Sequence, residues 1–196
     1  MLTRYLSKYG KVHHVHSRRP PINLCHVGNS RTGIDGVYFE WFDCDRPVVP
    51  EEAANHTVIF IYRNPVPAIY SRFGMTAHLR NIQCDDQVTI QEVASSGKDL
   101  YKLEEFFNNY TQAFKLNYDV VCVKYETLFD EFSNLDKALN ITSVPGQWPT
   151  RKETMRPTPH MHALRRIYAH LISKMDAMPP IHVVKGQSTK MLCSSK

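Results

Sequence analysis

The sequence contains no long apolar segment. Its most apolar stretches, such as Val58–Tyr62, run for about five residues, whereas a helix needs roughly 20 to cross a bilayer. The N-terminal residues 1–8 also lack the apolar centre of a signal peptide. We therefore expect neither a membrane-spanning segment nor a membrane partner.

The cysteines lack the pattern of a disulfide or zinc framework. There are five, an odd number, and no two of them form a CxxC pair. They are Cys25, Cys44, Cys84, Cys122 and Cys193. We interpret them as reduced thiols, which predicts a cytoplasmic location.

The sequence also lacks a run of five or more like charges. Its 24 basic and 19 acidic residues give a net charge of +5, and 42% of its residues are hydrophobic, which excludes a disordered chain. This mild positive excess suits an anionic small molecule. Binding of nucleic acid through Arg18, Arg19, Arg31 and Arg151 would rest on charge alone, so nucleic acid is not the expected partner.

Without repeats or linkers, residues 1–196 are expected to form a single α/β domain. Val58–Tyr62 and 120–123 are apolar on both faces, which is typical of interior parallel strands, and 11–16 is expected as a strand beside them. The turn-bounded segments 22–27 and 37–42 predict a hairpin. Helices are expected at 2–9, 68–73, 98–115, 126–139 and 160–175. The pattern predicts a three-layer domain with a mainly parallel sheet and a small hairpin insertion.

The most informative segment follows the strand Val58–Tyr62. Arg63 comes at the carboxyl end of this strand, where α/β sheets bind ligands. The chain then turns at Pro65 into a helix that carries Ser71, eight residues beyond Arg63. An arginine and a hydroxyl at one strand end can hold a phosphate by charge-assisted hydrogen bonds. The alternative is an arginine that stabilises a loop and a serine on a helix surface.

This segment resembles a known motif. Arg63-Asn64-Pro65 after an apolar strand, with Ser71 eight residues beyond the arginine, is similar to the 3′-phosphate-binding motif of sulfotransferases, a family of the P-loop nucleotide-binding class. In that family the arginine and serine hold the 3′-phosphate of 3′-phosphoadenosine 5′-phosphosulfate (PAPS). The segment 121–128 resembles the family's strand-to-helix segment. The overall pattern looks closest to the divergent sulfotransferase-like proteins of large DNA viruses.

The resemblance implies further site residues and an activity. The strand that ends in His16 resembles the one that supplies the family's catalytic base, and Arg151 and Lys152 stand where the family has a basic loop over the nucleotide. The prolines around 150–153 predict a loop near Arg63 without regular structure. The implied reaction is transfer of a sulfuryl group from PAPS to a hydroxyl or amine of an unidentified acceptor, with no metal.

One part of the family pattern is missing. No phosphosulfate-binding loop precedes Lys11, and the only candidate, 30–33, is followed by Ile34-Asp35-Gly36 instead of a long apolar helix. We therefore expect either an N-terminally shortened member or a donor that is held differently. The alternative function is a catalytically inactive binding module of the same fold.

The histidines before the first prolines allow a second alternative. His14 and His16 alternate to one face of their expected strand, with His13 on the other. Two imidazoles at this spacing suit a metal ion, but no third ligand stands at a recognisable spacing. The sequence therefore predicts no metal site, and His16 is either a general base or a polar residue near Arg18.

Overall fold

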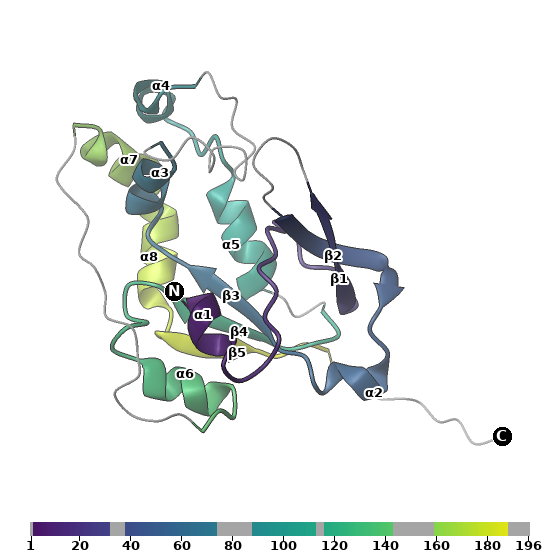
Figure 1. Cartoon of the computed structure of the whole chain (residues 1–196). Coiled ribbons are helices and arrows are strands. Elements are labelled where there is room, and N and C mark those ends of the chain that lie inside the picture. The colour runs from purple at the N-terminus through teal and green to yellow at the C-terminus, as the bar shows by residue number, and fades with distance from the viewer. Residues whose placement is uncertain (1, 32–37, 74–87, 113–115, 143–158, 188–196) are drawn as a thin grey trace. The chain divides into compact units, whose positions relative to one another are not determined.

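The computed structural model describes residues 2–31, 38–73, 88–112, 116–142 and 159–187 (Figure 1). The chain divides into two compact units. The first comprises Met1–Phe60, Asn108–Cys122 and Val183–Lys196, and the second comprises Ile61–Phe107 and Val123–His182. In the part of the chain that the structure describes, no helix is long and apolar enough to cross a membrane.

The first unit contains the predicted hairpin. Strands β1 (Cys25–Arg31) and β2 (Tyr38–Pro47) pair antiparallel, as Figure 1 shows. The pairing register shifts between Cys25 and His26, which marks an irregularity near the start of β1. The same unit holds α1 (Leu2–Leu6) and α2 (Pro50–Ala53). The antiparallel pairing confirms the hairpin, although its second strand continues to Pro47.

A second sheet contains β3 (Val58–Tyr62), β4 (Val120–Lys124) and β5 (Ile181–Val184), in the order β3-β4-β5. The backbone N–H of Tyr125 donates to the Tyr62 carbonyl (2.8 Å), so the carboxyl ends of β3 and β4 meet. The N–H of Lys124 instead donates to the carbonyl of Pro180, just before β5. The last strand therefore runs opposite to the first two, and the sheet is mixed.

The predicted three-layer fold with a mainly parallel sheet is wrong. Among the described residues the sheets have two and three strands, one antiparallel and one mixed. β4 is interior and its residues from Val120 to Val123 are buried, but β3 is an edge strand with Ile61 44% exposed. The expected strand 11–16 forms only one bridge, between Val15 and Glu40. Its lysine and three histidines leave it without an apolar face to bury.

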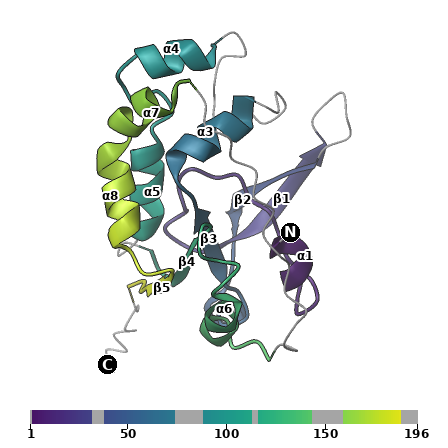
Figure 2. The ribbon, with the colours of Figure 1, turned by 90° about the vertical axis from the view of Figure 1, so that its left-hand side faces the viewer.

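The helices of the second unit differ in extent from the predicted segments. They are α3 (Pro65–Phe73), α4 (Ile90–Ser95), most of α5 (Leu103–Thr111), α6 (Phe132–Ala138), α7 (Met161–Ile167) and α8 (Ala169–Ala177). Helix α3 begins earlier than 68–73, whereas α5 and α6 are shorter than 98–115 and 126–139. Helix α7 packs against α3, α4 and α8, and Figure 2 shows these helices close together. Leu164 and Tyr168 are almost fully buried, which makes α7 and its end the centre of this helical layer.

Within β5, burial lowers the pKa of His182, and the charge of Lys124 lowers it further against the opposing effect of the Pro179 carbonyl. A depressed folded-state pKa means that the unfolded chain takes up the proton first as the pH falls. We expect the free energy of unfolding to decrease as the pH falls below about 6.5, the ordinary histidine value. Urea denaturation at pH 7 and pH 5 measures this decrease, which should be smaller in His182→Gln. An equal decrease in both proteins would contradict the prediction.

Candidate functional site

The turn between β3 and α3 explains two residues of the predicted motif. The side-chain oxygen of Asn64 accepts a hydrogen bond from the Val66 N–H (3.0 Å). The backbone carbonyl of Asn64 accepts a second one from the Ala68 N–H. Asn64 therefore caps the helix. Pro65 is the first helical residue, a position where its missing N–H costs nothing. The Asn-Pro pair thus has a sufficient structural role, and only Arg63 and Ser71 are left to indicate a ligand.

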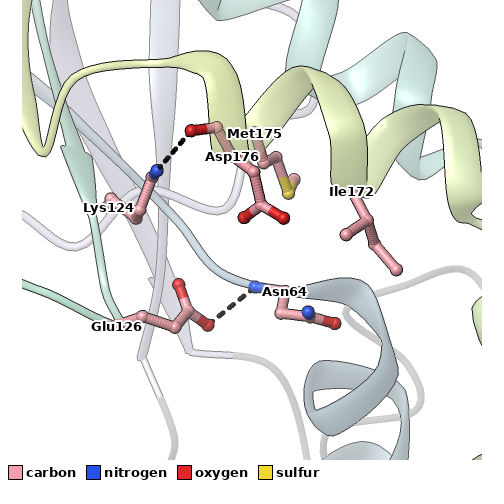
Figure 3. Close-up of a pocket in the computed structure, with 6 residues that line it drawn as sticks. All are labelled: Asn64, Lys124, Glu126, Ile172, Met175 and Asp176. Carbon is pink, nitrogen blue, oxygen red and sulfur yellow. Dashed lines mark hydrogen bonds between the residues drawn. The ribbon is translucent and has the colours of Figure 1, made fainter.

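The residues after β4 hold this turn in place. The N–H of Asn64 donates to a carboxylate oxygen of Glu126 at 2.8 Å (Figure 3). Together with the bond between Tyr125 and Tyr62, this contact joins the carboxyl ends of two neighbouring strands. The sequence placed the candidate site at such an edge, where ligands of α/β sheets bind.

Arg63 is held against an aromatic ring at this edge. Its guanidinium carbon lies 5.2 Å from the centre of the Tyr125 ring, within the range of a cation–π contact. Its Nε atom is buried and has no hydrogen-bond partner among the described residues. Leaving a buried donor unpaired costs about 1–3 kcal/mol, and more when the group is charged. An acceptor supplied by a ligand would remove this cost.

A second arginine, which the sequence reasoning missed, contributes to the same region. Arg72 lies in the last turn of α3. Burial lowers the pKa of its guanidinium, and the positive charge of Arg63 lowers it further. Two partly buried cations that influence each other make a favourable place for an anion. The only sequence signal was the position of Arg72 beside Ser71, and a cation near a helix C-terminus also has a structural explanation.

The hydroxyl of Ser71 is already engaged in a hydrogen bond within α3. Ser71 is exposed, and its hydroxyl donates to the Ala68 carbonyl one turn earlier in α3, at 2.8 Å. To donate to a phosphate, the hydroxyl would have to leave this bond. The phosphate-binding role of Ser71 stays a prediction.

The remaining predicted residues belong to the other unit or lie outside the described residues. His16 belongs to the first unit, whereas Arg63 and Ser71 belong to the second. Arg151 and Lys152, with the loop 150–153, lie outside the described residues. The candidate phosphosulfate loop is described only as far as Arg31, where β1 ends.

A small hollow lies near the same strand ends. It has a volume of about 50 Å³, with room for a few waters and none for a nucleotide. Figure 3 shows it between α8 and the turn that contains Asn64; Lys124 Nζ donates to the backbone carbonyl of Asp176 at 3.4 Å. The lining residues are Asn64, Lys124, Glu126, Ile172, Met175 and Asp176. We assign no ligand to this hollow.

Comparisons with models of protein families, with curated proteins and with solved structures gave no match to this chain. The sulfotransferase resemblance therefore stays a prediction from the residues of the Arg63–Ser71 segment. What the structure adds is Arg72 of α3, whose guanidinium interacts electrostatically with that of Arg63 after β3.

Proposed function

We propose that the protein binds a nucleotide with a 3′-phosphate, the class that contains PAPS and its desulfated product adenosine 3′,5′-bisphosphate, through Arg63. The observation that carries the proposal is the buried Nε of Arg63, which has no hydrogen-bond partner in the part of the chain that the structure describes and whose guanidinium carbon lies over the Tyr125 ring. This arrangement supports binding of a phosphate-sized anion. The choice of a 3′-phosphorylated nucleotide rests on the resemblance of the Arg63–Ser71 segment.

The charges of the site favour a doubly charged anion. Arg63 lowers the pKa of Arg72, which means that the two guanidinium groups repel each other. A phosphate dianion would offset this repulsion, and the planar guanidinium of Arg63 can bind two of its oxygens at once. Tyr125 restricts the orientation of the Arg63 guanidinium, so less conformational entropy is lost when the ligand binds.

The reaction proposed for such a donor is transfer of its sulfuryl group to a hydroxyl or amine. The acceptor is unidentified, and a reducing, cytoplasmic location belongs to the same proposal. A non-catalytic binding module is the alternative, favoured by the lack of a recognisable phosphosulfate loop. Formation of adenosine 3′,5′-bisphosphate from PAPS in the presence of candidate acceptors distinguishes the two functions.

Calorimetry of the wild-type chain at one fixed salt concentration tests binding directly. Adenosine 3′,5′-bisphosphate should bind more tightly than AMP, because the two ligands differ only in the phosphate that Arg63 would hold. The preference should be about tenfold or more, the effect of one hydrogen bond to a charged group. Equal affinity, or no binding of either nucleotide, would reject the proposed function.

A further inference from the structure

Two histidine rings lie next to each other in the first unit. Residues 13–16 run alongside β2, to which Val15 is joined by a bridge with Glu40. His14 and His16, two residues apart, are both exposed. Their ring centres are 4.5 Å apart, with an angle of 42° between the ring planes. The sequence indicated only that the two side chains share a face, whereas the structure brings their rings together.

The backbone around these rings is held by neighbours. His13 contacts β2, because its Nδ1 lies 3.0 Å from a carboxylate oxygen of Glu40. The other carboxylate oxygen accepts the backbone N–H of His14. Beyond His16, the Tyr110 hydroxyl donates to the carbonyl of Ser17 at 2.7 Å. The segment is therefore anchored on both sides of the two rings.

We propose that His14 and His16 form a two-imidazole site for a divalent transition-metal ion such as Zn²⁺. A zinc ion binds imidazole nitrogens at 2.0–2.1 Å, which places two tetrahedral ligands about 3.4 Å apart. Ring centres 4.5 Å apart bring the two imidazoles within reach of one ion, and rotation about the side-chain bonds sets the final separation of the nitrogens. Water completes the coordination, since both histidines are exposed.

The surroundings of the two rings favour the bound ion. The Glu40 carboxylate contacts His13 and the backbone N–H of His14, so an acidic group lies close to the proposed site. Neutral imidazole selects Zn²⁺, Ni²⁺ and Cu²⁺ over Mg²⁺ and Ca²⁺, which prefer oxygen ligands.

Titration of the full chain with Zn²⁺, monitored by calorimetry, tests the site. His14→Gln and His16→Gln should each weaken binding of one Zn²⁺ by roughly tenfold or more, the scale that damage to a metal site costs. The double variant should lose one zinc equivalent, and Mg²⁺ should not bind there. His13→Gln is the matched control, because the same substitution falls on the ring that faces Glu40, and it should retain that equivalent.

The proposal is overturned if the double variant binds as many zinc ions as the wild type, or if His13→Gln loses the same equivalent. The two histidines belong to the first unit and Arg63 to the second. Zinc titration therefore tests the metal site and nucleotide titration tests the proposed function. Failure of one proposal does not contradict the other.

Discussion

Replacing Arg63 by alanine is expected to lower the affinity for adenosine 3′,5′-bisphosphate roughly ten- to hundredfold. Loss of a hydrogen bond to a charged group costs about 1.5–3 kcal/mol, and the bound phosphate would lose its main cation. The affinity for AMP should change much less, because AMP lacks the phosphate that Arg63 binds. Calorimetry with both nucleotides at one salt concentration measures the difference.

Companion variants separate the geometry of Arg63 from its charge. Arg63→Lys should fall between wild type and alanine, since lysine keeps the charge and loses the two-pronged hydrogen bonding. Ser71→Ala should have a smaller effect, because it removes a neutral donor. Arg165→Ala, an exposed arginine of α7 in the same unit, is the matched control for net charge. An equal loss of affinity in Arg165→Ala and Arg63→Ala would show a general charge effect and contradict the assigned site.

Gly186→Ala is expected to destabilise the fold by roughly 1–3 kcal/mol or more, the usual cost of forcing an extra carbon into a packed region. A Cβ at this position would lie 2.5 Å from the backbone oxygen of Tyr118. The neighbouring backbone cannot move away freely, because the Gly186 N–H donates to the Asp119 carboxylate at 3.0 Å. Urea denaturation followed by circular dichroism measures the change in the free energy of unfolding.

Gly10→Ala supplies the control for this experiment. A Cβ at Gly10 would have no other atom within 4 Å, so the same substitution should change the free energy of unfolding by no more than about 0.5 kcal/mol. Similar losses of stability in the two variants would mean that close packing against Tyr118 is not the cause.

The two most apolar strands could be predicted from the sequence, but the pairing of strands in their sheet could not. Val58–Tyr62 and Val120–Lys124 are compact apolar segments, and both are strands in the structure. The short strand Ile181–Val184 was missed, since four residues after a helix carry little periodicity. Its antiparallel pairing with β4 makes the sheet mixed. Strand pairing depends on partners far apart in the chain, which no local pattern encodes.

Helix positions were predictable where apolar residues recur, but helix ends were not. The predicted helix begins at residue 98, yet Leu100 is 47% exposed and α5 begins only at Leu103. Lys102 has a φ of 48°, a left-handed conformation that interrupts a helix. The side chain of Asp99 accepts the N–H of Glu104 and so satisfies the first turn. These local contacts start α5 at Leu103, later than the periodicity of apolar residues predicts.

At the candidate site, the order of residues is enough to predict an apolar strand that ends before Arg63 and a turn at Asn-Pro into a helix. Strand composition, the cap and the fixed φ of proline are local properties, so the sequence carries them directly. Only the tertiary structure placed Arg63 over Tyr125, joined Asn64 to Glu126 and let the charge of Arg63 act on Arg72. These contacts depend on strand pairing and on how long side chains pack once the chain has folded. The physical reason is that burial and electrostatic interaction are set by distance in space, whereas the sequence records only distance along the chain.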